Sequence, residues 1–509
     1  MMDRNWSHMT VHGRVDCAEA DLKQWLGRGD FGAILDCAGH FVIVATDSHH
    51  SDVVIISSRS GLIKYFYSPH LSGRQFHHGP SVHSVVTSAD LPWGWDYDAL
   101  ADYFALGHPL GARSLNRDVQ RVPMGAVLRF SASAQGVEVT SYPDPQRNKQ
   151  GGGRGAVEQA LDALVQTAKR LPDEIDLSMS GGFDSRVLLA ALLAAGKRPR
   201  LIVSGARSSF DRDISEAIAK GCDLPLEAVV VSQADLLGAA NHVALSSDGQ
   251  LPLSHVAGLV HCQVLARPGV PLLMGFNGEF ARSYYTPQPA GKWLHLINRP
   301  PAEAVDVLID RIQPPFLPDE MAAVSQGLAQ ALSEEAIRSR LKKEIYALNA
   351  ENAAETLDEF YLSHYGRHKS GADLSFLTSI NIDWNVPFFD FKWINSIRNL
   401  DFSYKHGDLF HRKAVSILSK KLDRFPYESD LKFSSKKQHI YDQYIDQNIF
   451  KIKFTSEEPF IRNADPEFLE KDTLYKIFKS QNDHGLRPHI FFSLFTLLRW
   501  RDLTRNAIQ

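Results

Sequence analysis

The sequence predicts an α/β protein in which a β-rich domain is followed by a parallel-sheet domain with a helical C-terminal region. Short strand-like runs fill the first 145 residues, strands then alternate with amphipathic helices, and few strand signals follow residue 300. A chain of 509 residues is also too long for one hydrophobic core, so two or three domains are expected.

The first domain, residues 1–145, is predicted to consist mainly of strands. Apolar alternation and β-branched residues between polar or glycine-containing turns predict strands over 40–47, 52–58, 63–68, 126–133 and 136–142. A short helix is expected over 96–106. The next stretch, residues 146–155 (QRNKQGGGRG), is polar and glycine-rich and cannot bury side chains, which is typical of a linker.

The second domain, residues 156–509, is predicted to contain a parallel sheet. Its first helix is indicated by apolar residues spaced four, three and four apart, at Val157, Leu161, Leu164 and Ala168. Helices beginning near residues 187 and 213 alternate with predicted strands over 175–179, 200–205, 227–232 and 270–275. This alternation favours a parallel sheet with helices on both faces.

Composition argues against several functional classes. The net charge of −4 lacks the basic surplus of a nucleic-acid binder. The four cysteines lie far apart without a Cys-x-x-Cys pair, so neither a zinc site nor a disulfide framework is expected, and a reducing, cytoplasmic location fits. No apolar stretch reaches the ~18 residues of a membrane span, and the N-terminal residues lack an apolar signal core.

The sequence Ser-Gly-Gly-Phe-Asp-Ser at residues 180–185, here the SGGFDS loop, follows a predicted strand and opens a helix. Ligands of parallel sheets bind at the carboxyl ends of strands, where a helix that begins points free N–H groups outward. Gly181 and Gly182 let the backbone approach a bulky anion, while Ser180 and Ser185 supply hydroxyl groups. The loop is therefore predicted to bind nucleotide phosphates; the alternative is a structural turn with a helix-capping aspartate.

Asp184 is the unusual member of this loop, because a carboxylate beside a phosphate would repel it. The arrangement makes sense if a divalent cation lies between them, since Mg²⁺ prefers oxygen ligands from a carboxylate together with phosphates. The loop is not a Walker loop, because no Gly-Lys-Ser/Thr follows it.

The SGGFDS loop resembles the pyrophosphate loop of the ATP pyrophosphatases, and further segments narrow the resemblance to the asparagine synthetase family. Segments similar to that family's motifs are ILDCAGHFVIVATD with SSRSGLIKYFY, LADYFALGHPLGARSLNRDVQRVPMGAVLRF, LLMGFNGEFARSYY and INIDWNVPFFDFKWINSI. The resemblance implies a glutaminase-like first domain, an Ntn-hydrolase-like α+β sandwich. It also implies a parallel-sheet ATP pyrophosphatase domain, of the adenine nucleotide α-hydrolase-like type, with ATP and Mg²⁺ as cofactors.

The resemblance assigns binding roles to residues outside the loop. Met179 and Val203 take the positions that cradle adenine and ribose, although both could equally be plain core residues. Glu279 takes the place of an Asp-Glu pair that helps to hold metal and pyrophosphate, and its alternative is a helix cap. Gly275 and Gly278 would form the tight turn there. Arg282, one helical turn after Glu279, could pair with it or reach phosphate.

Two candidate catalytic residues also come from the resemblance. Asp383 takes the place of a glutamate that helps to bind or deprotonate the attacking amine, and the alternative is a surface acid. A lysine near residues 432–437 would stabilise charge on the intermediate, and Lys432 is favoured over Lys436 and Lys437. Any one of these lysines could also belong to a solvated basic face.

The sequence departs from the glutamine-using members of the family in two ways. Those members begin with a cysteine whose thiol attacks glutamine, whereas Cys17 is the first cysteine here and lies inside the chain. The first domain is therefore expected to lack glutaminase activity. Arg186 replaces a frequent serine and adds a cation at the helix start, which would suit a phosphate or a substrate carboxylate.

The function expected from these features is ATP-dependent, AMP-forming amide ligation of a small-molecule or peptide carboxylate. Without a working glutaminase, the amine is free ammonia or belongs to the substrate, as in the β-lactam synthetase and lasso-peptide cyclase branches of the family. A partner enzyme or peptide of the same pathway is possible, and neither nucleic acid nor a membrane is expected. The alternatives are an ammonia- or glutamine-dependent asparagine synthase, another ATP pyrophosphatase, and an inactive ATP-binding scaffold.

Overall fold

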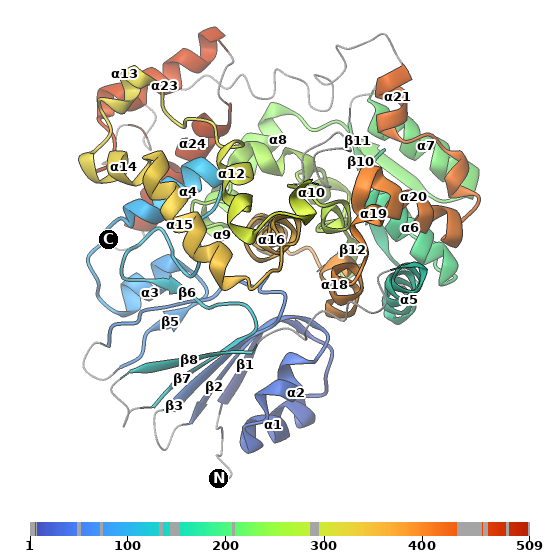
Figure 1. Cartoon of the computed structure of the whole chain (residues 1–509), viewed down its shortest axis with the longest axis horizontal. Coiled ribbons are helices and arrows are strands. Elements are labelled where there is room, and N and C mark those ends of the chain that lie inside the picture. Colours follow the sequence, from blue (N-terminus) through green and yellow to red (C-terminus); the bar gives the residue numbers. More distant parts are fainter. Residues whose placement is uncertain are drawn as a thin grey trace.

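The computed structural model describes residues 6, 8–47, 52–71, 75–131, 136–142, 153–205, 209–285, 295–434, 461, 467–484 and 488–506. It is a mixed α/β protein with an N-terminal antiparallel sheet, a parallel five-stranded sheet and a helical C-terminal region (Figure 1). This arrangement confirms the coarse fold class expected from the sequence.

The N-terminal sheet has the order β1-β2-β3-β7-β8 and is antiparallel throughout. Its strands are β1 (His8–Val15), β2 (Gly39–Asp47), β3 (Asp52–Ser57), β7 (Ala126–Phe130) and β8 (Val137–Ser141). A second sheet has the order β5-β4-β6 and consists of β4 (Phe66–Tyr67), β5 (His78–Gly79) and β6 (Gln120–Arg121). Four of the five predicted strands are confirmed at near-predicted bounds, whereas the run over 63–68 is a strand only at Phe66–Tyr67.

Different side chains cover the two faces of the N-terminal sheet. One face packs against α1 (Glu19–Arg28) and α2 (Phe31–Leu35), neither of which was predicted. Leu22 and Leu26, four residues apart, form the buried stripe of α1. The other face packs against Tyr65 and Tyr67 near the second sheet. Helices α3 (Val82–Ser88) and α4 (Tyr97–Leu106) complete this part of the chain, and α4 matches the helix predicted over 96–106.

Cys17 and Cys37 form a disulfide, which corrects the expectation that the cysteines stay unpaired. The antiparallel pairing of β1 with β2 sets Val15 opposite Gly39. Cys17 lies two residues after Val15 and Cys37 two residues before Gly39, so the pairing brings the two cysteines to a Cα separation of 6.2 Å. Sequence spacing alone did not reveal this contact, because β1 was not predicted.

Reduction of this disulfide is expected to lower the stability of the N-terminal domain. Because a loop of 20 residues is closed, Cys17→Ser should cost about 3 kcal/mol of unfolding free energy. Urea unfolding with and without dithiothreitol measures this. The wild-type protein should respond to the reductant and the Cys17→Ser variant should not; equal midpoints for both proteins under both conditions would contradict the expectation.

The second predicted domain contains a parallel sheet of five strands, which has the order β11-β10-β9-β12-β13. Its strands are β9 (Asp176–Ser178), β10 (Arg200–Ser204), β11 (Leu226–Val229), β12 (Leu272–Leu273) and β13 (Trp384–Asn385). Helix α5 (Arg154–Arg170) precedes β9, and the helices between β9 and β12 are α6 (Asp184–Ala194), α7 (Phe210–Cys222), α8 (Gln233–Gly238), α9 (Ala240–Ser246) and α10 (His261–Leu265). The predicted alternation is confirmed, but β13 was missed because two residues carry no periodic signal.

The rest of the chain is helical, as predicted. Its helices are α12 (Ala304–Ile309), α13 (Pro318–Met321), α14 (Gln326–Ala331), α15 (Glu334–Ala347), α16 (Ala353–Phe360), α17 (Arg367–Ser379), α18 (Phe391–Arg398), α19 (Phe402–Lys405), α20 (Leu409–Leu418), α21 (Glu428–Ser434), α23 (Lys471–His484) and α24 (Pro488–Asn506). A π-helical turn, Tyr361–Gly366, joins α16 to α17. None of the helices within the described ranges has the length and apolar character needed to cross a membrane.

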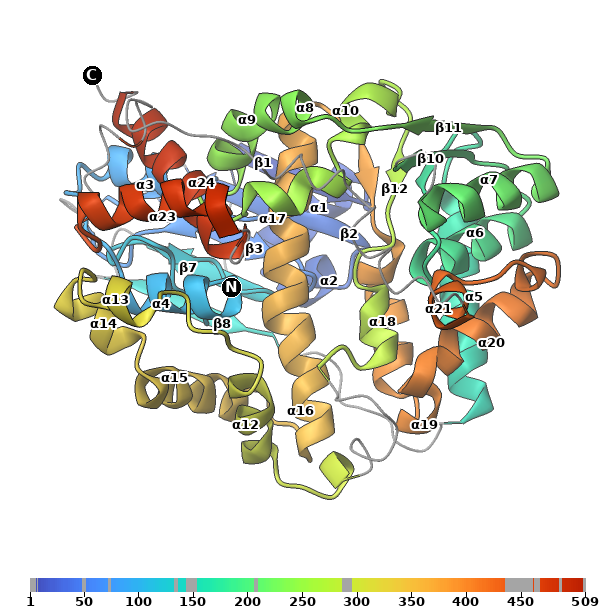
Figure 2. The ribbon, with the colours of Figure 1, turned by 90° about the horizontal axis from the view of Figure 1, so that it is seen from above.

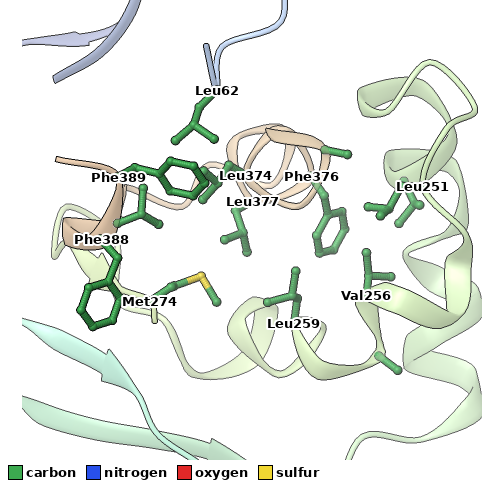
Figure 3. Close-up of a cluster of buried hydrophobic side chains, with 14 of the residues drawn as sticks. Leu62, Leu251, Val256, Leu259, Met274, Leu374, Phe376, Leu377, Phe388 and Phe389 are labelled. Carbon is green, nitrogen blue, oxygen red and sulfur yellow. The ribbon is translucent and has the colours of Figure 1, made fainter. Parts of the chain in front are cut away.

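The two predicted domains share one hydrophobic core. Leu62 of the N-terminal part points toward Leu374 and Phe389 of the helical part (Figure 3). At the other end of this core, Trp500 of α24 contacts Trp93 with ring centroids 5.2 Å apart. The C-terminal helix therefore returns to the first domain, and it packs beside α9 and α23 (Figure 2).

Candidate functional site

The SGGFDS loop leaves the central strand of the parallel sheet and opens α6. β9 is flanked by β10 on one side and β12 on the other, all parallel. The carboxyl ends of these strands therefore meet at one edge, as predicted. Two hydroxyl groups close the loop: Ser180 Oγ lies 3.0 Å from Ser185 Oγ, and the Gly182 N–H donates to Ser180 Oγ at 3.3 Å.

A carboxylate from the next unit of the sheet contacts this loop. The Gly181 N–H donates to Asp211 Oδ1, and Asp211 lies in the first turn of α7 after β10. The Asp211 carboxylate oxygen occupies the position at the Gly181 N–H that a phosphate oxygen would occupy if this N–H were free. The loop backbone is therefore able to bind an anionic oxygen, and Asp211 is the group that a phosphate would meet first.

The turn after β12 packs directly on Asp184. A Cβ atom added to Gly278 would lie 2.2 Å from Asp184 Oδ1, and one added to Gly275 would lie 3.0 Å from Asp184 Cβ. Both glycines are thus required by close approach, as the sequence predicted. Because these two turns touch, Glu279 and Asp184 lie on the same side of the sheet, in agreement with the prediction of a shared site.

Two nitrogen-containing side chains contact the Asp184 carboxylate. His411 Nε2 lies 2.9 Å from Asp184 Oδ1, and an Arg282 guanidinium nitrogen lies 3.4 Å from Asp184 Oδ2. Burial raises the pKa of Asp184, but the contacts with His411 and Arg282 outweigh it and lower the pKa. Arg282 thus pairs with Asp184 and also with Asp408, at 3.5 Å.

Glu279 is a second carboxyl group within electrostatic reach of Asp184. Burial, followed by the charge of Asp184, raises the pKa of Glu279, and the Tyr361 hydroxyl donates to Glu279 Oε2 at 3.2 Å. Two neighbouring buried carboxyl groups repel each other unless a cation or a proton separates them. This donor set fits Mg²⁺ brought in with nucleotide phosphates, because Mg²⁺ takes one or two carboxylates and the phosphate oxygens.

Several residues of the site could not be found from the sequence. His411 lies in α20, more than 200 residues after Asp184, and the segment around it has no motif. Tyr361 begins the π-helical turn, a feature that often marks functional sites but has no sequence signature. In the sequence, Asp211 is indistinguishable from any other acidic residue in the first turn of a helix, here α7.

Arg186 does not face a ligand, which corrects the sequence interpretation. Its side chain is fully buried, and its guanidinium donates to the carbonyl oxygens of Phe425 at 2.7 Å and Pro426 at 2.8 Å. The guanidinium carbon also lies 3.8 Å from the ring centroid of Tyr427. Arg186 therefore anchors the segment that leads into α21.

The remaining nucleotide candidates lie near the loop. Met179 and Val203 lie at the carboxyl ends of β9 and β10, and both side chains are buried in the sheet. Among the lysine candidates, Lys432 lies in α21 but its side chain is outside the described residues, as are Lys436 and Lys437. The first residue of that helix, Glu428, donates its N–H to the Gly181 carbonyl oxygen at 3.2 Å, so α21 begins at the SGGFDS loop.

Asp383 lies at the opposite edge of the sheet, which removes it as the base of this site. The Leu272 N–H donates to the Asp383 carbonyl oxygen at 2.8 Å, so Asp383 immediately precedes β13 at the amino ends of the strands. Its side chain lines a cavity of about 560 Å³ beside Arg170 and Leu171, which end α5. No member of the SGGFDS loop lines this cavity.

Gly278→Ala is expected to disrupt the site without unfolding the protein. The new methyl group would overlap the Asp184 carboxylate, so pyrophosphate release from ATP should fall at least ~10-fold. Gly258→Ala is the matched control, because its methyl group would meet no atom within 4 Å. Wild-type turnover by Gly278→Ala would show that this contact does not shape the active geometry.

Comparisons with known proteins leave the site unassigned. No family model matches the chain, and no curated protein matches it. Within the residues the structure describes, no three or more His, Cys, Asp or Glu side chains group as a preformed metal site. Asp184 and Glu279 would therefore need oxygen ligands from the nucleotide to complete a metal coordination shell.

Proposed function

We propose that the protein is an ATP-dependent, AMP-forming amide ligase of the asparagine synthetase type. The observation that carries this proposal is the meeting of the SGGFDS loop with Glu279 at the carboxyl edge of a parallel sheet. At this edge, N–H groups that can bind an anionic oxygen lie beside two neighbouring carboxyl groups suited to Mg²⁺. Each feature alone would fit a structural turn; together they match an adenylation site.

The proposed chemistry has two steps. A substrate carboxylate is a poor electrophile, because its leaving group would be oxide. Its oxygen therefore attacks the α-phosphorus of ATP, pyrophosphate leaves, and an acyl-adenylate forms. An amine then attacks the acyl carbon, and AMP leaves as the amide bond forms. The SGGFDS loop binds the pyrophosphate portion, and Asp184 with Glu279 would hold Mg²⁺, which offsets the charge of the phosphates.

The amine is free ammonia or belongs to the substrate. A cysteine nucleophile must be a thiolate, and the Cys17 sulfur is bonded to Cys37, so Cys17 cannot serve a glutaminase reaction. This favours a ring-closing or ammonia-using ligase in specialised peptide or metabolite biosynthesis, such as a lasso-peptide macrolactam cyclase or a β-lactam-synthetase-like enzyme, over a glutamine-dependent asparagine synthase.

The test is nucleotide turnover by the full chain. Purified protein is incubated with Mg-ATP and a panel of amino acids and peptides that carry a free carboxylate, and pyrophosphate and AMP are measured. The expected result is substrate-dependent release of both in equal amounts. Release of ADP and phosphate instead would overturn the proposal. Asparagine formed from aspartate and ammonia would select the asparagine synthase alternative.

One observation favours a second candidate, an inactive ATP-binding scaffold. Asp211 accepts a hydrogen bond from the Gly181 N–H, and His411 and Arg282 contact Asp184, so protein groups satisfy the loop without a nucleotide. Calorimetric titration with Mg-ATP separates the candidates. Binding without pyrophosphate release across the whole panel would support the scaffold, whereas turnover excludes it.

A further inference from the structure

A small cavity between the N-terminal part and α17 is lined by cations. Its volume is about 30 Å³, and its charged lining residues are Lys64, Arg113, Arg121 and Lys369. No carboxylate lines it within the described ranges of the chain. Buried charges in proteins are normally paired, so a lining of one sign needs an explanation.

Arg121 is the unpaired cation of this group. Lys64 pairs with Asp248 at 2.7 Å, Lys369 pairs with Asp373 at 2.8 Å, and Arg113 faces three aspartates. Arg121 is 3% exposed, and in the described structure it has no carboxylate partner. Its guanidinium instead donates to the Gly61 carbonyl oxygen at 2.9 Å, and its Nε has no hydrogen-bond partner.

The buried guanidinium of Arg367 adds a second positive charge beside Arg121. Arg367 Nε donates to the same Gly61 oxygen at 3.1 Å, and its other donor contacts the Val122 carbonyl oxygen. Burial, and then the charge of Arg367, lower the pKa of Arg121. An arginine does not lose its proton in a protein, so this repulsion is relieved by a nearby anion rather than by deprotonation.

His368 adds a second unused donor to the cavity. Its Nδ1 lies 2.8 Å from an Arg121 guanidinium nitrogen, which can only donate, so the ring proton lies on Nε2. That Nε2 is buried and has no hydrogen-bond partner. The ring stacks on His108 with centroids 5.0 Å apart. His108 Nδ1 faces the Pro109 carbonyl oxygen at 3.1 Å and must donate, so its unpartnered Nε2 is an acceptor.

We propose that this cavity is a binding site for a small inorganic anion of the size of chloride. Arg121 and His368 line one space, and each has a buried donor, Nε and Nε2 respectively, without a hydrogen-bond partner. Asp248 acts on the Arg121 charge electrostatically but forms no ion pair with it among the described residues. A space of 30 Å³ holds two or three water-sized species, because each needs ~10–15 Å³ of such volume. An anion with one hydrating water, which donates to His108 Nε2, fills it; a phosphate ester does not fit.

The site would join two parts of the protein that are distant in sequence. Arg121 belongs to β6 of the N-terminal part, and His368 belongs to α17. An anion beside Arg121 neutralises the charge that otherwise disfavours its approach to Arg367, the first residue of α17. Its binding should therefore stabilise the folded state by mass action, independently of any nucleotide chemistry.

Thermal unfolding of the full chain tests the proposal. In sodium chloride, the wild-type midpoint should exceed that in sodium gluconate of equal ionic strength by roughly 3 °C at saturation. Arg121→Gln should lose this difference. Arg117→Gln, at an arginine whose side chain is 63% exposed, should retain it. Equal wild-type midpoints in both salts, or a full chloride effect in Arg121→Gln, would overturn the site.

Bromide supplies a test that needs no variant. Crystals of the wild-type chain soaked in sodium bromide should give an anomalous peak between Arg121 and His368. A peak there supports the site even if Arg121→Gln fails to fold. A water-like peak without anomalous signal, in crystals whose other surface sites bind bromide, would show that the cavity holds only water.

Discussion

Replacing Asp184 with asparagine is expected to reduce pyrophosphate release from ATP by at least ~100-fold while the protein stays folded. Asparagine keeps the shape of the side chain but removes the charge that a metal ion between protein and phosphates would need. It also removes the carboxylate charge that His411 and Arg282 contact at this position. Turnover with Mg-ATP and a productive carboxylate substrate measures the effect.

A matched substitution separates this role from a general charge effect. Asp173→Asn removes the same charge from a side chain that is 96% exposed and pairs only with Lys197 at the surface, so turnover should be unchanged. Circular dichroism and urea unfolding check that the Asp184 variant is folded. A folded Asp184→Asn protein with wild-type turnover would remove Asp184, and with it the metal site, from the proposed mechanism.

Replacing Lys405 with methionine is expected to lower the free energy of unfolding by about 3–5 kcal/mol. Lys405 Nζ lies 2.6 Å from Asp358 Oδ2, and both side chains are only 1% exposed. Methionine fills similar volume but removes the ammonium group that lies beside the buried Asp358 carboxylate. Urea unfolding followed by tryptophan fluorescence gives the difference, provided that the transition has two states.

The double variant Lys405→Met/Asp358→Asn tests the cause. Removing both charges should recover a large part of the loss, because the cost arises from a buried carboxylate that has lost its ammonium partner rather than from the missing attraction. Lys23→Met is the surface comparison, since Lys23 is 61% exposed and pairs with exposed Glu19; it should change stability by less than ~1 kcal/mol. A loss in the double variant equal to that of the single variant would contradict this explanation.

Local sequence signals were sufficient for much of the fold. β2 and β3 were predicted because alternating β-branched residues are bounded by turn residues, and the SGGFDS loop because strand, glycines and helix follow one another. β1 was missed because only Met9, Val11 and Val15 of HMTVHGRV are apolar, and Gly13 interrupts their alternation, although all three pack on the core of the sheet. Without β1, the register that pairs Cys17 with Cys37 could not be foreseen.

The candidate site was predictable only where it is contiguous in sequence. Gly275, Gly278 and Glu279 follow β12 directly, so sheet topology brought them to Asp184 as expected. His411 reaches Asp184 through helix packing, which no local pattern records. Asp383 was misplaced because a motif position gives no information about which edge of the sheet a residue occupies, and here the start of β13 is the amino edge.

The contact between Trp93 and Trp500 has a consequence for synthesis of the protein on the ribosome. About 400 residues separate the two rings, and translation at roughly 5–20 residues per second takes about 20–80 s to produce them. During that interval the apolar surface around α3 and α4 has no α24 to cover it, and it is open to chaperones or to misassociation. Nascent chains that stop short of α24 would keep this surface exposed, so quality-control proteases should remove them faster than full-length chains.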